Sequence, residues 1–245
     1  MPPFPWRLVT VNIDGTLTSE HGWRPIAAAR GCLRAYTAYR KALLAGREDE
    51  NSHLRHLFAF AVGLTPDRLE PILQRTRRVQ GIPETVAELH ARGARVPLLT
   101  HNPAFLIRWY CDTFGFDGGS GGWGLSLRHG RVQPPGRVVA DKVRGLRTLR
   151  REFGVPFGRI CHVGDAWPDA RLAPLLGGFI AFNPKRPAVA RVADATVRGT
   201  DLRAILPVLD RLRPRRPLND ARPLDAPSNT READTAGGRH GIRRP

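Results

Sequence analysis

The chain has 245 residues, of which 41% are hydrophobic and 25% are charged, and its formal net charge at pH 7 is +17. This length is enough for one domain with an insertion and for a substantial core. No stretch approaches the ~20 apolar residues that a membrane-spanning helix needs, and the start of the chain lacks the features of a signal peptide. We therefore expect a cytoplasmic protein without a membrane partner.

The positive charge raises the hypothesis of nucleic-acid binding. Nearly all the basic residues are Arg, with Lys only at positions 41, 142 and 185, and they are spread along the chain rather than gathered in one stripe. A basic nucleic-acid-binding protein therefore stays an alternative, and nucleic acid is not the partner that we expect. The same field attracts small anions such as phosphate esters. The three cysteines form no Cys-x-x-Cys pair, which argues against a disulfide framework or a zinc site.

Short apolar runs alternate with helical patterns along most of the chain. Pro begins several of the predicted helices and Gly ends several, as helix capping favours. This alternation is typical of an α/β fold with a parallel sheet. The predicted strands are 7–13, 94–100, 159–164 and 177–182, and the predicted helices between them are 83–93, 103–115, 139–154 and 168–176.

Residues 20–81 interrupt the alternation, since they contain no good strand. Apolar residues recur there at helical spacing from Ile26 to Leu43, and two more helical patterns follow at 53–63 and 65–79. We therefore expect an all-helical insertion after the first strand. Ligands of parallel sheets usually bind at the carboxyl ends of the strands, and a helical cap of this size fits over such a site.

Turn residues and composition predict the character of three more segments. Residues 126–132 fit a small hairpin that turns at His129. The run GGSGGWG at 118–124 matches G-x-G-x-x-G by letter, but it precedes a hairpin instead of opening a helix, so we expect a flexible loop. The segment 213–245 is rich in Pro, Arg and Asp with few large apolar residues, which predicts a disordered basic tail.

Polar residues suited to phosphate follow the predicted strands. Each of them has an ordinary structural explanation when it is taken alone, for example a helix cap or a solvated lysine. Their order, spacing and repeated placement after apolar runs indicate a shared site at one edge of the sheet. The residues of this constellation are Asn12, Asp14, Thr100, Lys142, Asp165 and Asp169.

This constellation resembles the four motifs of the haloacid dehalogenase (HAD) superfamily of phosphatases, which are D-x-D-x-T, a Ser or Thr after a strand, a Lys, and G-D-x-x-x-D. The resemblance covers about residues 7–212 and is nearest to the phosphoserine phosphatase-like branch. It implies a Rossmann-like core formed by 1–19 and 82–212, with a helical cap at 20–81. The matching residues are Asn12-Ile13-Asp14-Gly15-Thr16, Thr100, Lys142 and Gly164-Asp165 through Asp169.

The resemblance also implies catalytic roles for four residues. The first Asp of the family's first motif attacks phosphorus, and Asn12 stands at that position. The second Asp, here Asp14, protonates the leaving oxygen and then activates water. Thr100 would donate a hydrogen bond to a phosphoryl oxygen, and Lys142 would balance the charge of the phosphate. The implied reaction is hydrolysis of a small phosphorylated metabolite.

The resemblance further implies a bound Mg²⁺ ion and a substrate-binding segment. Asp165 would hold the ion with help from Asn12, the Asp14 carbonyl group and Asp169, since hard oxygen ligands suit Mg²⁺. Substrate would contact Thr100 and Lys142, together with the two residues that follow Thr100, which are His101 and Asn102.

Asn12 departs from the family pattern. Gly15-Thr16-Leu17-Thr18 directly after Asp14 fixes the register, so an amide occupies the nucleophile position. An amide is a poorer nucleophile than a carboxylate and brings no charge to a divalent cation, so the covalent route should be lost or severely slowed. Two interpretations stay open: a phosphatase in which Asp14 guides direct attack by water, and a catalytically inactive phosphate-ester binder with a regulatory role.

The identity of the phosphate ester stays open as well. Phosphoserine phosphatases use a Glu near the cap to bind the substrate ammonium group. Here Glu20 lies near that position, one residue before His21. Phosphoserine is therefore only one of the candidate substrates, and the oligomeric state is not indicated.

Overall fold

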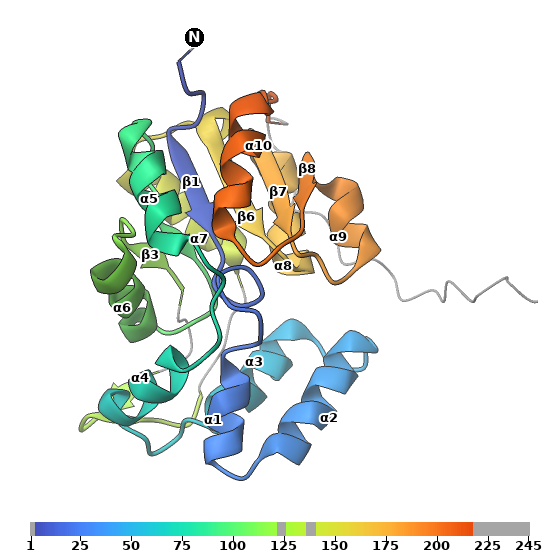
Figure 1. The fold of residues 1–245 in the computed structure, drawn as a ribbon. Helices are drawn as coiled ribbons and strands as arrows, with labels where there is room; N and C mark the ends of the chain where they lie inside the picture. The colour runs from blue at the N-terminus through green and yellow to red at the C-terminus, as the bar shows by residue number, and fades with distance from the viewer. Residues whose placement is uncertain (1–2, 122–125, 136–140, 218–245) are drawn as a thin grey trace, which may run out of the picture.

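The computed structural model describes residues 3–121, 126–135 and 141–217. Its centre is a six-stranded parallel sheet with the strand order β3-β2-β1-β6-β7-β8 (Figure 1). This is the α/β, Rossmann-like architecture that the sequence predicts. The strands are β1 (Leu8–Val11), β2 (Leu98–Leu99), β3 (Gly119–Ser120), β6 (Ile160–Gly164), β7 (Gly178–Phe182) and β8 (Ala195–Val197).

The order in which strands are added to the sheet reverses at β1. The chain builds β2 and β3 on one side of β1 and then returns to build β6, β7 and β8 on the other side. The carboxyl ends of β1 and β6 therefore lie at the point where the winding reverses, which is where open α/β sheets usually bind ligands. Asn12 directly follows β1, and Asp165 directly follows β6.

Alternate residues of the central strands enter different parts of the core. Val9 and Val11 pack in a cluster with Val86 and Leu209, whereas Leu8 packs with Leu146 and other leucines on the opposite face. All four residues of β1 are buried, as expected for a strand covered on both faces. The period of two along β1 thus decides which layer each side chain joins.

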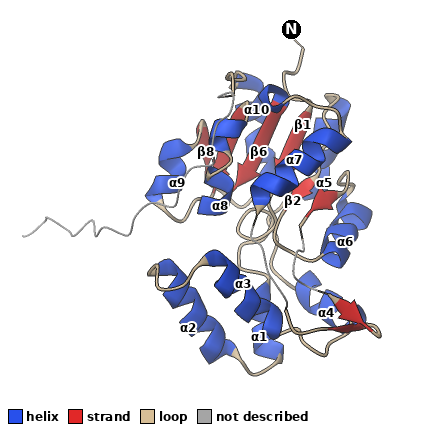
Figure 2. Ribbon diagram, turned by 180° about the vertical axis from the view of Figure 1, so that it is seen from behind, coloured by secondary structure: helices blue, strands red, loops and turns tan. Residues whose placement is uncertain are grey.

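Helices cover both faces of the sheet. Figure 2, seen from behind, shows α7 in front of the strands, while α5 and α10 lie in front of them in Figure 1. Trp6 connects the segment before β1 to Leu209, because its Nε1–H donates to the main-chain oxygen of Leu209 at 3.0 Å. The helices around the sheet are α5 (Ile82–Ala91), α6 (Ala104–Phe114), α7 (Lys142–Glu152), α8 (Trp167–Ala170), α9 (Pro187–Val192) and α10 (Leu206–Arg211).

Four helices lie between β1 and α5, at the end of the sheet where the strands finish (Figure 1). The first two of these helices are separated by a turn at Gly31, which has a φ of +67°. The third helix is capped by the side chain of Asp49, which accepts a hydrogen bond from the main-chain nitrogen of Ser52. Residues 20–81 are all described and contain no strand. These helices are α1 (Trp23–Ala29), α2 (Leu33–Leu44), α3 (Glu50–Ala59) and α4 (Pro66–Gln74).

The predicted hairpin is present as β4 (Leu127–Arg128) and β5 (Arg131–Val132), with positive φ at its turn residue His129. It packs against the helical insertion rather than the sheet. The main-chain nitrogen of Gly63 donates to Val132 O, and the nitrogen of Val132 donates to Leu64 O, both at 2.9 Å. The insertion is thus completed by a segment from much later in the chain.

Several predicted boundaries were wrong for identifiable reasons. The strand expected at 94–100 is reduced to β2, because Pro97 has no N–H to donate to a ladder. The helix expected at 168–176 divides into α8 and a 3₁₀ turn at Ala173–Leu175, where Pro174 again removes a donor. The glycine-rich run contributes the edge strand β3 instead of a flexible loop, and its residues 122–125 lie outside the described residues.

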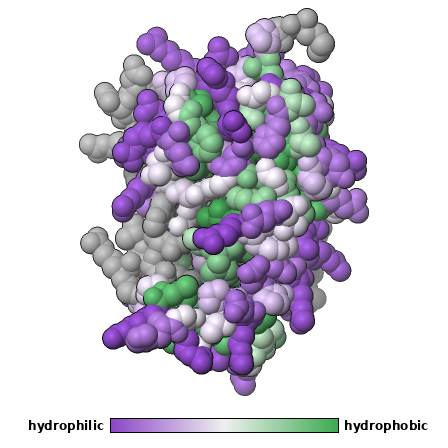
Figure 3. All heavy atoms as spheres, turned by 90° about the vertical axis from the view of Figure 1, so that its left-hand side faces the viewer, coloured by the Kyte–Doolittle hydropathy of each residue, from purple (hydrophilic) through white to green (hydrophobic). Residues whose placement is uncertain are grey.

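The expected tail begins at 213, and its first residues contact the core. The main-chain nitrogen of Arg215 donates to Gly177 O at 2.9 Å, and the Arg215 guanidinium lies 3.2 Å from Asp194. Residues 218–245 lie outside the described part of the chain. None of the described helices has the length and apolarity to cross a bilayer. Hydrophilic side chains cover most of the side shown in Figure 3, where apolar groups surface only in small areas.

Candidate active site

A tight loop follows β1 and carries the first candidate residues. The main-chain oxygen of Ile13 accepts bonds from the nitrogens of Thr16, Leu17 and Thr18 at 2.9–3.2 Å. Gly15 has a φ of +81°, and a Cβ at this position would lie 2.1 Å from Asp165 Oδ2. Glycine is therefore required at position 15 for two reasons, which are the backbone conformation and the close approach of Asp165.

Asn12 contacts the loop and the end of β6 at the same time. Its Nδ2 donates to Asp14 O at 2.9 Å and to Asp165 Oδ1 at 3.2 Å. Its main-chain nitrogen donates to Val163 O at 2.9 Å. The side chain is 6% exposed and that of Asp165 is 5% exposed. The residue at the expected nucleophile position is thus hydrogen-bonded to two of the oxygens that were expected to hold Mg²⁺.

Asp14 is held from both sides. Its Oδ1 accepts from the main-chain nitrogen of Gly22 at 2.7 Å, and its Oδ2 accepts from Asn102 Nδ2 at 3.1 Å. The same Asn102 nitrogen donates to Thr100 Oγ1 at 3.0 Å. Gly22 is the N-cap of α1, so the start of the helical insertion fixes one oxygen of Asp14 and the segment after β2 fixes the other.

Lys142 and Asp169 form a buried ion pair behind Asp165. Lys142 Nζ lies 2.5 Å from Asp169 Oδ1. Asp169 Oδ2 accepts from the main-chain nitrogens of Asp165 and Ala166 at 3.2 and 3.1 Å. Burial alone would raise the pKa of Asp169, but Lys142 and the hydrogen bond from His162 outweigh it and hold the pKa well below its usual range. Both oxygens of Asp169 are therefore already bonded, which distinguishes it from Asp165.

Asp165 carries the opposite shift. Burial and the neighbouring charge of Asp169 raise the pKa of Asp165 to about 7. Lys142 and Lys185 oppose this rise, and Thr16 Oγ1 donates to Asp165 Oδ1 at 3.4 Å. A carboxylate in this setting gains from a cation beside it, because the cation offsets the cost of burying its charge.

The oxygen donors at this point suit Mg²⁺ in type. They are the Asp165 carboxylate and the main-chain oxygen of Asp14. Asn12 Oδ1 is a third donor when the side-chain amide is flipped by 180°, which exchanges its oxygen and nitrogen. Among the described residues, no group of three His, Cys, Asp or Glu side chains is arranged around a metal position. A site of this composition would therefore depend on amide and main-chain oxygens and would carry less negative charge than a site with two carboxylates.

His101 is placed near the site without a hydrogen bond to it. Its Nε2 is buried and has no partner among the described residues. Burial, assisted by the positive charge of Lys142, lowers the pKa of His101 to about 3. His21 is similar, since its Nδ1 is unpartnered among the described residues and burial lowers its pKa to about 4. Both rings are thus neutral near pH 7.

Sequence reasoning missed the buried pair His162 and Thr10. Thr10 Oγ1 lies 2.8 Å from His162 Nδ1, and His162 Nε2 lies 2.9 Å from Asp169 Oδ1. Sequence reasoning also gave no indication that His53 of the insertion is buried: this residue is 2% exposed and its ring lies 3.6 Å from Glu48. A polar residue inside an otherwise apolar run was the signal available for His162.

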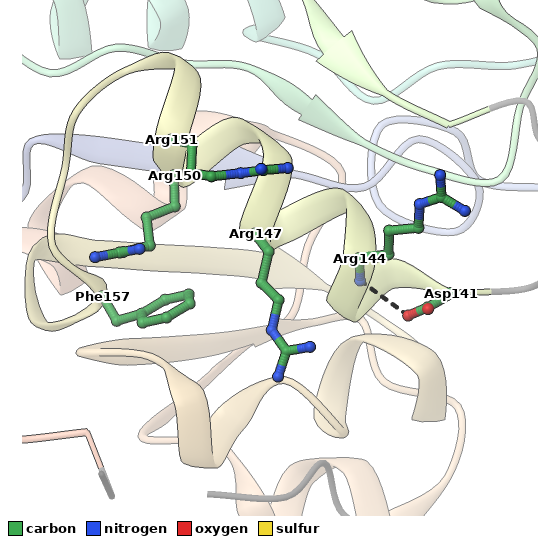
Figure 4. Close-up of a pocket in the computed structure, with 6 residues that line it drawn as sticks. All are labelled: Asp141, Arg144, Arg147, Arg150, Arg151 and Phe157. Carbon is green, nitrogen blue, oxygen red and sulfur yellow. Dashed lines mark hydrogen bonds between the residues drawn. The ribbon is translucent and has the colours of Figure 1, made fainter. Parts of the chain in front are cut away.

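A strongly basic hollow lies along α7, outside the set of candidate residues. It has a volume of about 580 Å³, and its lining includes Asp141 and Phe157 (Figure 4). The Arg150 guanidinium lies 4.8 Å from the centre of the Phe157 ring. The remaining lining residues are Arg144, Arg147 and Arg151.

Residues 6–177 match the model of the haloacid dehalogenase-like hydrolase family. The chain belongs to this family. Two curated relatives of this HAD-like chain are phosphoserine phosphatases. The relative SerB2 of Mycobacterium tuberculosis is 26% identical over 82% of this chain and 49% of its own length. The relative from Methanocaldococcus jannaschii is 24% identical over 82% of this chain and 96% of its own length. The chain thus spans about half of the first relative and nearly all of the second.

Solved structures share the HAD fold with this chain. A substrate-bound phosphoserine phosphatase superposes with a TM-score of 0.71 at 21% identity, covering 83% of this chain and 98% of that one. A HAD family hydrolase from Salmonella enterica serovar Typhi gives a TM-score of 0.73 at 17% identity, covering 85% and 72%. At these identities the similarity establishes the fold alone, and it agrees with the parallel sheet described above.

Proposed function

We propose that this chain is a Mg²⁺-dependent phosphomonoesterase that acts on a small phosphorylated metabolite at the carboxyl ends of β1, β2 and β6. Membership of the HAD-like hydrolase family and the phosphoserine phosphatase relatives support the reaction class. The observation that carries the proposal is the joining of three separate segments at Asp14, where Asn102 links Asp14 to Thr100 while Asn12 links Asp14 to Asp165.

Each side chain has a role that follows from its contacts. Asp165, the main-chain oxygen of Asp14 and Asn12 Oδ1 would hold Mg²⁺, which supplies positive charge beside the phosphoryl oxygens when bound. Thr100 Oγ1 would donate to a phosphoryl oxygen. Lys142 would add a second positive charge, held in place by Asp169. Because both Asp169 oxygens are already bonded, we assign Asp169 to positioning Lys142 rather than to direct metal ligation.

Hydrolysis would proceed by direct attack of water. The water oxygen forms a bond to phosphorus while the bond from phosphorus to the ester oxygen breaks. Asp14 accepts the proton of the water and delivers it to the leaving alkoxide. The bonds from Gly22 and Asn102 aim the Asp14 carboxylate for both transfers. Asn12 forms no covalent intermediate in this route, so turnover is expected to be slow.

A phosphate-ester binder without turnover is the second candidate. The bonds from Asn12 to Asp14 O and Asp165 Oδ1 favour it, since they join the two strand ends without help from an ion. The two candidates predict the same ligands and differ in turnover. The nucleic-acid alternative would draw on the basic hollow along α7, whose lining includes none of the candidate site residues.

Hydrolysis of an aryl phosphate with and without Mg²⁺ tests the proposal, using the wild type, Asn12→Asp and Asp165→Ala. Activity in the first two proteins and none in Asp165→Ala supports the water route. An inert wild type with an active Asn12→Asp variant supports the binder. If neither the wild type nor Asn12→Asp hydrolyses any member of a panel of phosphate esters or binds inorganic phosphate, the proposal is overturned.

A further inference from the structure

His162 lies in the middle of β6, fully buried, three residues before Asp165. Its parallel register partner in β1 is Thr10, which is also fully buried. Polar groups at such positions are costly unless they are hydrogen-bonded. Both ring nitrogens of His162 have hydrogen-bond partners: Nδ1 contacts Thr10, and Nε2 contacts Asp169 of the candidate site.

The contact with Asp169 indicates which ring nitrogen of His162 carries the proton. Asp169 Oδ1 accepts from Lys142 Nζ and lies 2.9 Å from His162 Nε2, so Nε2 must donate to a carboxylate oxygen. The Thr10 hydroxyl, 2.8 Å from Nδ1, can then donate to the free lone pair of the ring. The neutral Nε2–H tautomer satisfies the Asp169 carboxylate and the Thr10 hydroxyl. Nδ1 also lies 3.1 Å from the main-chain oxygen of Thr10, which accepts no proton from the ring in this tautomer.

We propose that His162 is a positioning residue, which as the neutral Nε2–H tautomer fixes Asp169 so that Asp169 holds the Lys142 ammonium group at the phosphate position. The role of Lys142 in this statement rests on the proposed function, whereas the tautomer and the contacts of Asp169 do not. The Lys142 side chain is 5% exposed and its Nζ has Asp169 as its bonded carboxylate. The direction of that carboxylate therefore decides where the ammonium group lies.

The chain offers matched comparisons for this role. The Phe179 ring stacks near His162, with ring centroids 6.1 Å apart and planes 14° apart, so an apolar side chain of similar size can fill the space. His162→Leu retains the packing and removes the donor. His162→Gln retains an N–H donor. Thr10→Val removes the hydroxyl without changing the shape. Cys161→Ala is the control, since Cys161 is equally buried in the same strand and packs on the other face.

The tautomer is measured directly by long-range ¹H–¹⁵N NMR of the histidine-labelled wild-type protein at pH 7, with the His162 signals assigned by their loss in His162→Gln. We expect a protonated Nε2 and an unprotonated Nδ1, and we expect Thr10→Val to shift the Nδ1 signal. A Nδ1–H tautomer, or an unchanged Nδ1 signal in Thr10→Val, would overturn the proposal. This measurement does not depend on turnover, and Thr10→Val keeps it decisive if His162→Leu fails to fold.

The link to Lys142 is measured by calorimetric binding of inorganic phosphate and, where turnover is found, by kcat and KM for an aryl phosphate. We expect His162→Leu to weaken phosphate binding by about 10- to 100-fold, by analogy with the loss of a residue that orients a metal-binding side chain. His162→Gln should recover most of this loss, and Cys161→Ala should match the wild type. Equal phosphate affinity in folded His162→Leu and wild type would overturn the proposal. If no protein binds phosphate although NMR finds the expected tautomer, the proposed function fails instead.

Discussion

The Asn12 side-chain amide donates to Asp165 Oδ1 at 3.2 Å, a contact that two carboxylates could not make without a shared proton or a cation between them. The amide therefore lowers the need for a counter-ion at the end of β1. It also removes one negative charge from the oxygens that would hold Mg²⁺. The Asn12 amide thus stabilises the site when no ion is bound, and the same amide lowers the affinity of the site for Mg²⁺.

Asn12→Asp should bind Mg²⁺ more tightly than the wild type and should be less stable when the ion is removed with EDTA, because the introduced carboxylate and Asp165 then repel each other. Its kcat for an aryl phosphate should rise by at least about tenfold, which is ~1.4 kcal/mol of activation free energy. Calorimetry with Mg²⁺, thermal melting and initial rates measure these effects.

Gly15→Ala should displace Asp165, because the added Cβ would lie 2.1 Å from Asp165 Oδ2. Gly93→Ala is the matched control: its φ is +82° against +81° at Gly15, and no atom lies within 4 Å of its added Cβ. Both variants should lose about 1–2 kcal/mol of unfolding free energy to backbone strain. Only Gly15→Ala should also lose Mg²⁺ binding. Equal Mg²⁺ affinity in the two variants would contradict the close packing of the loop on Asp165.

Asp14→Asn should preserve the loop and lower turnover. An amide oxygen can still accept the bond from the Gly22 nitrogen, but the side chain can no longer carry a proton from water to the leaving group. The expected loss in kcat is about 10²- to 10⁴-fold, with a small change in KM. Asp112→Asn, an exposed position on α6, serves as the control for loss of charge. A fully active Asp14→Asn would exclude Asp14 as the acid-base group.

Acid should destabilise the protein through its buried neutral histidines. The pKa of His101 falls from its ordinary value of 6.5 to about 3 on folding. Between these values the unfolded chain binds a proton that the folded chain excludes, so the free energy of unfolding decreases as pH falls below 6.5. His101 contributes about 2 kcal/mol of this loss between pH 7 and pH 5. Urea unfolding at the two pH values should show a smaller loss in His101→Asn than in the wild type.

The strands that the sequence predicted best are those buried on both faces. The runs 159–164 and 177–182 differ from β6 and β7 by one residue at the start, since continuous apolar sequence leaves few alternatives. The edge strands β3 and β8 were missed. They have two and three residues, and they form because a neighbouring strand offers unpaired groups, which no local pattern records.

The candidate site was predictable where a residue follows a strand. Hydrogen bonds join Asn12, Asp14, Asp165, Thr100 and Asn102, while the roles assigned to them stay predictions. The contacts of His162 were not predictable, because the position of a histidine inside an apolar run does not indicate which residues it will contact. Those partners depend on the register between β1 and β6, which is a property of the assembled sheet.

The central place of β1 has a consequence for synthesis on the ribosome. Its two neighbours, β2 and β6, begin at Leu98 and Ile160, so the first strand to emerge has to wait for most of the chain before it can pair on both edges. The four apolar or β-branched residues of β1 stay exposed to solvent during that interval, and this exposure favours aggregation when translation stalls. A nascent chain arrested before residue 160 should therefore require a chaperone that covers the segment around β1.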